Sequence, residues 1–263
     1  MSTVTFTHIG GPTTLIEVDG WRILTDPTFD APGRTYKFGW GTSSRKTTAP
    51  AIDPSQVGGI DAVLLTHDQH ADNLDDAGRD LLREAGTVIT TASAARRLGG
   101  GARGLQAWAS TRLEVPGRPT ITVTATPCRH GPPGSRPIVG EVTGFALTWP
   151  GQEQGALWIS GDTVLCGRVR EVATRLDVGT AILHLGRVGF PITGRLKYTM
   201  SGADAVELCS LLRPRTAIPV HYEGWSHFRQ GQEQILADLE CASSDVASSI
   251  LWATLGKPFE LTA

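Results

Sequence analysis

Residues 63–75 are the stretch best suited to chemistry, because an apolar run leads directly into two histidines and three carboxylates. The run 63–65 is typical of a buried strand, and apolar residues recur at helical spacing from Leu74 onward. Imidazole nitrogens and carboxylate oxygens are ligands that Zn²⁺, Mn²⁺ and Fe²⁺ accept, and the end of a strand holds them rigidly. The simpler alternative is a polar loop, since Asp72, Asn73 and Asp75 are all good helix N-caps.

The same arrangement recurs along the chain, where an apolar strand and often a Gly- or Pro-containing turn precede a histidine or an aspartate. Four such residues follow predicted strands: His130, Asp162, His184 and His221. Repeated placement of ligand-type side chains at strand ends favours one shared site over unrelated surface residues.

The composition is that of a globular protein and disfavours a nucleic-acid partner. In 263 residues, 40% are hydrophobic and 19% charged, and the 31 glycines and 16 prolines favour short strands joined by tight turns. The net charge is −2, with few lysines, so the chain offers no basic surface for a phosphate backbone. We therefore expect a small-molecule substrate.

The chain has no feature that predicts export or membrane insertion. Its first residues lack a basic segment followed by an apolar run, and no apolar stretch approaches twenty residues. The four cysteines form no C-x-x-C pair, which indicates reduced thiols: Cys128, Cys166, Cys209 and Cys241. We expect a cytoplasmic protein without a membrane span.

The elements that position these residues alternate between groups of strands and helices, which favours one α/β domain over residues 1–263 with two similar halves. Strands are predicted at residues 4–8, 13–18, 21–25, 61–66, 87–90, 120–126, 142–149, 156–160, 181–183, 216–220 and 250–253. Helices are predicted at residues 74–85, 92–98, 167–176, 201–212 and 232–239. Residues 28–54 and 189–199 are expected to be long loops, the first carrying several aromatic residues.

Six motifs in order resemble those of the metallo-β-lactamase-fold hydrolases. They lie at residues 11–17, 24–27, 65–67, 130, 160–163 and 219–221. The chain looks closest to the branch that contains ascorbate-6-phosphate lactonase and N-acyl-phosphatidylethanolamine phospholipase D. The resemblance implies a four-layer αββα sandwich with the metal at one edge, between the two sheets.

The family's H-x-H-x-D-H motif matches imperfectly. With His67 as the first histidine, the second falls on Gln69 unless one residue is inserted, and His70 and Asp72 then take the next two roles. Anchoring on Asp72 instead places Asp68 first and still uses His70. Both alignments put Asn73 at the last histidine, and an amide is a poor ligand for these ions.

The resemblance implies zinc, as one or two ions, with Mn²⁺ or Fe²⁺ as alternatives. The implied ligands of the first ion are His67, His70 and His130. Those of the second ion are Asp72 and His221, with Asp68 as a further candidate, and Asp162 is implied to lie between the two ions. A single occupied site is the alternative that Asn73 leaves open. His184 is expected beside the site, Asp26 either supports the motif or forms a turn, and His227 either reaches the cleft or caps a turn.

The expected activity is metal-dependent hydrolysis, in which a metal-bound hydroxide attacks an ester, lactone, amide or phosphodiester bond of a small substrate. Asp72 or Asp162 would orient the nucleophile, and in the absence of a second ion Asp68 or His184 would accept a proton. The aromatic loop residues favour a partly apolar substrate, whereas three cations near the second loop, Arg187, Arg195 and Lys197, would suit a phosphate or carboxylate. Alternatives are a phosphodiesterase or nuclease of the same fold, an iron-dependent redox protein, and a non-catalytic binding protein with a degraded site.

Overall fold

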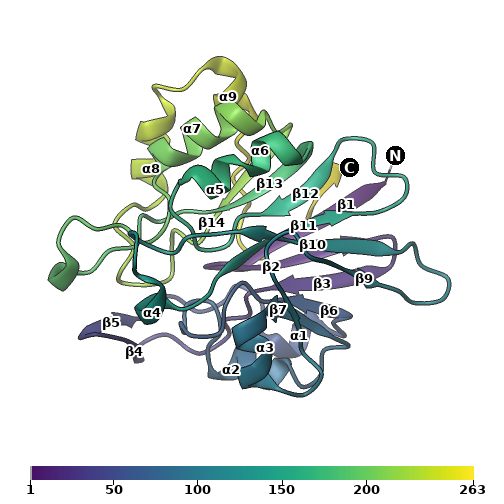
Figure 1. Cartoon of the computed structure of the whole chain (residues 1–263), viewed down its shortest axis with the longest axis horizontal. Helices are drawn as coiled ribbons and strands as arrows, with labels where there is room; N and C mark the ends of the chain where they lie inside the picture. The colour runs from purple at the N-terminus through teal and green to yellow at the C-terminus, as the bar shows by residue number, and fades with distance from the viewer. Residues whose placement is uncertain (1) are drawn as a thin grey trace.

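Two β-sheets lie face to face in the computed structural model, which describes residues 2–263 (Figure 1). The larger sheet has seven strands, in this spatial order: β15 (Phe259–Thr262), β1 (Thr3–Gly10), β2 (Thr13–Val18), β3 (Trp21–Thr25), β6 (Ala62–Leu64), β7 (Val88–Thr91) and β8 (Arg103–Leu105). The smaller sheet has six: β14 (Thr216–Val220), β13 (Val178–His184), β12 (Ala156–Ile159), β11 (Thr143–Thr148), β10 (Ile121–Pro127) and β9 (Ser110–Leu113).

Helices cover the outer face of each sheet, which gives the predicted four-layer αββα sandwich. The larger sheet is covered by α1 (Pro54–Val57), α2 (Asp76–Leu81) and α3 (Ala92–Leu98) (Figure 1). The smaller sheet is covered by α5 (Gly167–Arg170), α6 (Val172–Arg175), α7 (Gly202–Leu212), α8 (Gln232–Leu239) and α9 (Ser244–Ser249). Two short segments lie at the edge of the sandwich: α4 (Arg136–Val139) and the 3₁₀ turn η1 (Pro191–Thr193). Across residues 2–263, no helix is long and apolar enough to cross a bilayer.

The main hydrophobic core lies between the sheets, because alternate residues of each strand point inward. Phe6 and Ile23 from the larger sheet and Phe145 and Ile159 from the smaller one are fully buried there. Burial of a side chain of this size stabilises the fold by roughly 1.5–3 kcal/mol. Two further clusters pack the outer helices onto the sheets, so both sheets are buried on both faces.

The turn between β2 and β3 forms as its sequence predicts. Asp19 and Gly20 both have positive φ, at 46° and 82°. That backbone conformation is the one that a two-residue type I′ hairpin requires, and Asp-Gly adopts it readily. The hairpin fixes the register of β3, and β3 in turn pairs with β6 in the parallel orientation.

The prediction of a loop over residues 28–54 was wrong in its middle part. A hairpin of β4 (Thr35–Gly39) and β5 (Thr42–Arg45) forms there, and Tyr36 and Phe38 are buried while their neighbours along β4 are exposed. The alternation is clear but extends over only five residues, among many Gly, Ser and Thr residues. It was too short for the period-two pattern to stand out.

Other differences concern short or edge elements. The helix expected over residues 74–85 covers only Asp76–Leu81, since the Asp75 side chain caps it by accepting from the backbone N of Gly78 at 2.9 Å. The helix expected over residues 167–176 is two short helices, α5 and α6. Residues 250–253 are not a strand, and only Ile250 makes an isolated bridge. The sequence analysis missed three strands, β8, β9 and β15, and four short helical segments, α1, α4, α9 and η1.

Candidate metal centre

The carboxyl ends of four strands converge at one edge of the sandwich. Strands β12, β13 and β14 are parallel neighbours, so His184 at the end of β13, Asp162 after β12 and His221 after β14 lie at the same edge. The turn after β6 brings His67 to this edge from the other sheet. The site is therefore assembled from both sheets.

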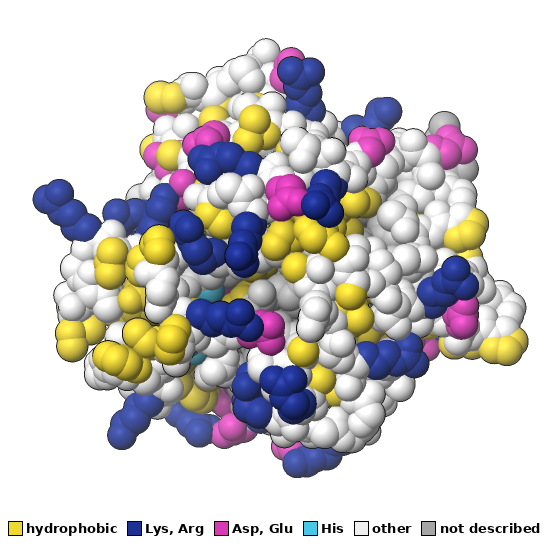
Figure 2. All heavy atoms as spheres, in the orientation of Figure 1, with side chains coloured by type: hydrophobic (Ala, Val, Ile, Leu, Met, Phe, Trp, Pro, Cys, Tyr) yellow, Lys and Arg dark blue, Asp and Glu magenta, His cyan; other side chains and the backbone are white. Residues whose placement is uncertain are grey.

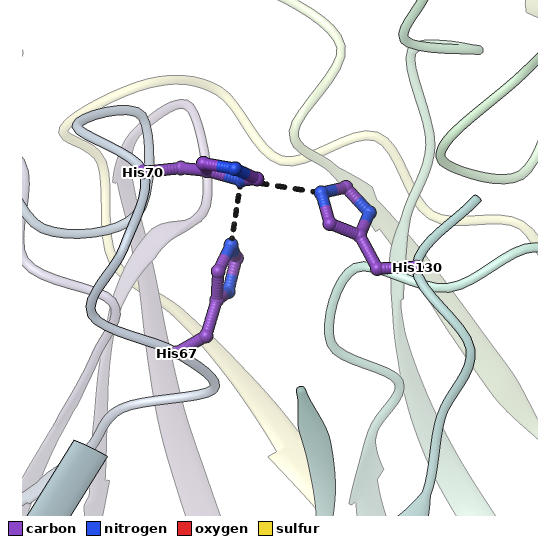
Figure 3. A group of neighbouring side chains, drawn as sticks. All are labelled: His67, His70 and His130. Atoms are coloured by element: carbon purple, nitrogen blue, oxygen red, sulfur yellow. Dashed lines mark hydrogen bonds between the residues drawn. The ribbon is translucent and has the colours of Figure 1, made fainter. Parts of the chain in front are cut away.

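The first cluster consists of His67, His70 and His130, whose rings face one another (Figure 3). His67 Nε2 lies 3.1 Å from His70 Nδ1, and His130 Nε2 lies 3.2 Å from the same atom. His130 Nδ1 is 2.8 Å from the backbone oxygen of Tyr198. That contact requires the proton on Nδ1, which leaves the Nε2 lone pair directed at the other two rings.

Burial keeps these three imidazoles neutral. It lowers the pKa of His67 and His70, and together with the nearby His70 it lowers the pKa of His130 to about 3. A metal binds the neutral form of histidine, so the ring nitrogens are available as ligands at neutral pH.

The second cluster consists of Asp72, His221 and His227, all buried. Asp72 Oδ2 lies 3.2 Å from His221 Nε2 and 3.0 Å from His227 Nε2. Burial alone would raise the pKa of Asp72, but His227 and His221 outweigh it and hold that pKa well below its usual range. Conversely, burial would lower the pKa of His221, and the carboxylates of Asp162 and Asp72 raise it to about 9.

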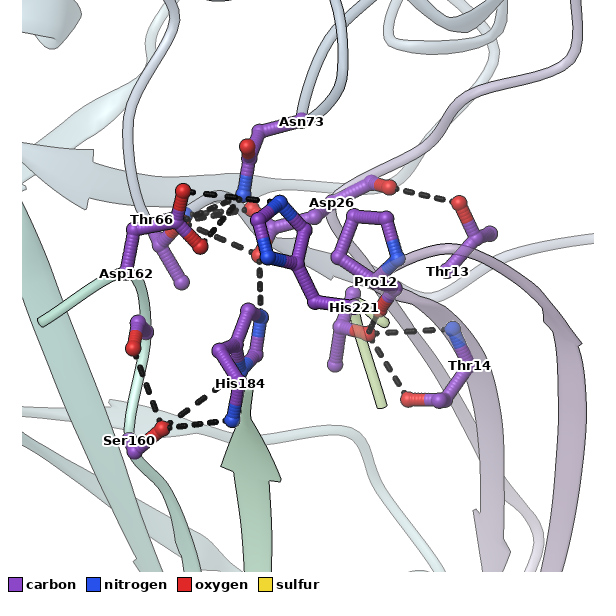
Figure 4. A network of polar contacts seen from close by, with 12 residues as sticks. Pro12, Thr13, Thr14, Asp26, Thr66, Asn73, Ser160, Asp162, His184 and His221 are labelled. Carbon is purple, nitrogen blue, oxygen red and sulfur yellow. Dashed lines mark hydrogen bonds and ion pairs between the residues drawn. The ribbon is translucent and has the colours of Figure 1, made fainter. Parts of the chain in front are cut away.

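Asp162 and Asn73 lie next to the second cluster (Figure 4). Asp162 Oδ2 is 3.5 Å from His221 Nε2, and Asp162 Oδ1 accepts a hydrogen bond of 3.4 Å from the Asn73 amide. Burial raises the pKa of Asp162 to about 6, although His221 opposes this shift.

Several buried polar atoms of this region have no hydrogen-bond partner within residues 2–263. Among them are Asp72 Oδ1, Asp162 Oδ2 and His221 Nδ1. Leaving such atoms unpaired costs about 1–3 kcal/mol each. Their nitrogen and oxygen chemistry suits a divalent cation of the zinc type, so the residues fit a metal centre.

Asp26 and His184 form a supporting network behind the clusters (Figure 4). Asp26 Oδ1 accepts from the Thr66 backbone N at 2.7 Å, and both Asp26 oxygens lie 3.0 Å from Thr66 Oγ1. His184 Nε2 is 3.2 Å from Asp26 Oδ2, and the Ser160 hydroxyl accepts from the His184 backbone N. Asp26 thus holds the backbone next to His67, and His184 contacts Asp26 without joining either cluster.

The structure places Asp68 away from both clusters. Its carboxylate forms an ion pair with Arg97, whose Nε donates to it at 2.9 Å. Gln69 is exposed and packs against Gly140, where its side chain occupies the space that a Cβ would need. The residue between Asp68 and His70 therefore bulges outward, and His70 lies with His67 in the first cluster.

An apolar pocket of about 440 Å³ opens above His70, Asp72 and His130. Its walls come from the β4–β5 hairpin and the 189–199 segment, and include Phe38, Trp40, Phe190, Ile192, Leu196 and Tyr198. The Phe38 ring stacks on His70 with centroids 5.1 Å apart, and the Phe190 ring stacks on His227 at 5.6 Å. Both segments expected to be loops thus contribute aromatic residues to the site.

Sequence reasoning left His227 undecided, although it completes the second cluster. Its Nδ1 contacts the Ser44 hydroxyl on β5, so the β4–β5 hairpin helps to orient its ring. The only signal in the sequence was a histidine in a Gly-Trp-Ser-His turn shortly after His221. Lys197, one of the cations considered for a phosphate, is paired with Asp204 at 2.8 Å.

Comparison with known proteins agrees with this geometry. The family model described as a beta-lactamase superfamily domain matches residues 21–222. Two UPF0173 metal-dependent hydrolases are similar in sequence. One, from Pyrobaculum neutrophilum, is 26% identical, and the match covers 87% of this chain and 88% of the relative. The other, from Opitutus terrae, is 28% identical, and the match covers 88% of this chain and 90% of the relative. The crystal structure of an isothiocyanate hydrolase from Delia radicum gut bacteria superimposes with a TM-score of 0.79 at 20% identity, over 98% of this chain and 99% of that one. The chain belongs to the metallo-β-lactamase superfamily and is a metal-dependent hydrolase of that fold.

Proposed function

We propose that the centre holds two divalent ions, with zinc as the first candidate and Mn²⁺ or Fe²⁺ as alternatives. The proposed ligands are His67, His70 and His130 for one ion, Asp72, His221 and His227 for the other, and Asp162 between them. The observation that carries the proposal is the presence of two separate triads of buried ligand atoms, each triad within 4.8 Å. Imidazole with a carboxylate is a donor set that zinc accepts readily.

In this proposal His227 takes the role of the last motif histidine, whose position is occupied by Asn73 in this chain. An amide is a weak ligand, but Asn73 donates to Asp162 and so holds that carboxylate in place. His227 Nε2 lies 3.0 Å from Asp72 Oδ2. His227 would therefore supply the second imidazole that the altered motif lacks. Two ions are then compatible with the loss of the last motif histidine.

When bound, such ions lower the pKa of a water molecule from about 15.7 to about 7 and polarise the oxygen of the bond to be broken. Asp162, whose Oδ2 has no hydrogen-bond partner among the described residues, would help to hold the ions and would orient the attacking water. Asp72 holds the imidazoles of His221 and His227. Asp26, supported by His184, fixes the backbone that carries His67.

The substrate proposed is a small, partly apolar molecule with an ester, lactone or amide bond. The pocket of about 440 Å³ above the first cluster is large enough for such a group, and its lining is mainly apolar and aromatic. A phosphodiester is the second candidate, because the same centre would stabilise its transition state.

Elemental analysis of the purified protein tests the metal proposal. We expect about two equivalents of metal in the wild type, about one in His227→Ala, and loss of metal and activity in Asp162→Ala. Asp68→Asn is the matched control, since Asp68 pairs with Arg97 and should leave both ions in place. Two equivalents in His227→Ala would contradict the assignment of His227. Hydrolysis of p-nitrophenyl butyrate, a lactone, an isothiocyanate and bis(p-nitrophenyl) phosphate would then identify the bond.

A further inference from the structure

A second cavity, of about 820 Å³, also borders His130. Residues of α3, α4 and α5 and the segment that follows β10 line it, and it shares His130 and Val139 with the apolar pocket. Four arginines and one carboxylate line this cavity: Arg96, Arg129, Arg136, Arg168 and Glu141. We call it the arginine pocket.

The positive charge of the arginine pocket is largely uncompensated. Glu141 is already engaged, because it pairs with Arg136 at 2.9 Å and accepts from the Ser93 backbone N at 3.1 Å. None of the ion pairs within residues 2–263 includes Arg96, Arg129 or Arg168. Three guanidinium groups in one concave space, whose one lining carboxylate is already paired with Arg136, create a potential that attracts anions.

Arg129 differs from an ordinary surface arginine. It is half-buried, and its Nε is fully buried without a hydrogen-bond partner in the described chain. A buried donor without an acceptor is destabilising, and the Arg129 residue itself lines the cavity. Guanidinium groups bind carboxylate, phosphate and sulfonate oxygens through paired, charge-assisted hydrogen bonds. Arg96 and Arg168 are exposed and complete the rim.

We propose that the arginine pocket binds an anionic group, a carboxylate, phosphate or sulfonate, of the molecule that is hydrolysed at the metal centre; this inference rests on the proposed function. Figure 2 shows histidine atoms at the bottom of a hollow, with hydrophobic side chains to its left and Lys and Arg side chains beside and above it. A substrate with an apolar end in one pocket and an anionic end in the other would place its central bond beside His130. The preferred substrate is therefore amphipathic.

Two arms test the proposal, both on the full chain. The first titrates inorganic phosphate into the protein at low salt and follows the Nε–H signals of the arginines by NMR. The protein is treated with a chelator beforehand, so that phosphate cannot bind to metal. We expect a saturable change in chemical shift in the wild type. The affinity for phosphate should fall at least tenfold in the double variants Arg129→Gln/Arg168→Gln and Arg96→Gln/Arg168→Gln. The second variant changes only exposed arginines and so protects the test against misfolding. Arg83→Gln/Arg112→Gln removes the same charge from exposed sites elsewhere and should bind as the wild type does.

The second arm compares p-nitrophenyl butyrate with mono-p-nitrophenyl succinate, which has a carboxylate at the end of the same acyl chain. On metal-loaded protein, we expect each pocket variant to raise KM for the succinate ester at least tenfold, and to leave the butyrate ester unchanged. Equal phosphate binding in the pocket and control variants would overturn the anion site. Equal effects on the two esters would overturn its role in substrate binding. Phosphate binding that depends on the arginines, in a protein that hydrolyses neither ester, would support the pocket and count against the proposed function.

Discussion

At the scale of single residues, Asp26 has an influence that its position outside both clusters hides. It accepts hydrogen bonds from Thr66 and lies 3.2 Å from His184, so it links the backbone before His67 to strand β13 of the smaller sheet. Burial raises its pKa to about 7, because the hydrogen bonds from Thr66 offset only part of the desolvation. We infer that Asp26 positions the ligands, because it binds the backbone before His67 and belongs to neither triad of ligand atoms.

Replacing Asp26 should therefore loosen the centre without removing a ligand. For Asp26→Asn we expect metal affinity or kcat to fall by about 10–100-fold, as is typical when the residues that orient metal ligands are changed. Competition with a chromophoric chelator measures the affinity. Asp177→Asn, at an exposed carboxylate, is the control. Unchanged affinity and turnover in Asp26→Asn would show that Thr66 holds its conformation without this carboxylate.

The lowered pKa of His130 predicts a pH dependence of the metal-free protein. Its folded pKa is about 3, whereas an unfolded histidine titrates near pH 6.5, so the unfolded chain binds the extra proton between these values. The contribution of His130 to stability is thus present above about pH 6.5 and is lost as the pH falls toward 3. We expect the unfolding free energy of His130→Asn, measured in urea on chelator-treated protein, to increase relative to that of the wild type as the pH is lowered from 7 to 4.5. A constant difference in unfolding free energy would refute this.

At the scale of elements, the short helix α2 is pressed against the end of β3. A Cβ at Gly78 would lie 2.0 Å from the backbone oxygen of Pro27, and the Asp75 carboxylate that caps α2 also pairs with the buried Lys46 at 2.8 Å. Only glycine allows α2 to approach this closely. The contact fixes the turn of residues 67–75 between β6 and α2, and that turn carries both His70 and Asp72.

Gly78→Ala tests this contact. We expect a loss of about 1–3 kcal/mol in the free energy of unfolding, the usual cost of overpacking a well-packed site. Gly167→Ala is the matched control, because that glycine is also helical and has open space around its Cβ position. Equal stability of the two variants, by urea unfolding of the metal-free forms, would mean that α2 shifts freely.

At the scale of the whole molecule, the centre joins the two sheets. His67, His70 and Asp72 follow β6 of the larger sheet, whereas His130, Asp162 and His221 follow strands of the smaller one. The main core also lies between the sheets. We propose that residues 1–263 form one domain, in which neither half is stable alone.

This proposal predicts one thermal transition in calorimetry, both with metal and without it. Ligands that bind only the folded state raise its stability in proportion to the logarithm of their concentration, so Tm should rise with added metal. His67→Ala should reduce that rise. Two transitions, of which only one responds to metal, would contradict a single domain.

The resemblance to a known family implied the four layers of the fold, and local patterns predicted the strand ends at which the clustered residues lie. The strand ends before His67, Asp162 and His221 are marked by apolar runs, and the Asp19-Gly20 turn by its two residues. His227 could not be assigned, since its role depends on the distant hairpin that holds its ring.

The arginine pocket also has no local pattern. Its arginines come from separate elements and lie together only after the two sheets pack. Membership of the lactonase and phospholipase branch stays a prediction.

The second cluster has a consequence for how the protein matures in the cell. Asp72 and His221 are 149 positions apart in the chain, and His227 follows later still. A ribosome adds the residues in order, so most of the chain must be synthesised before this cluster can close. Under the proposed assignment, the second cluster would therefore take up its ion only after the chain has been synthesised as far as His227, and the ion bound would depend on the cations present at that stage.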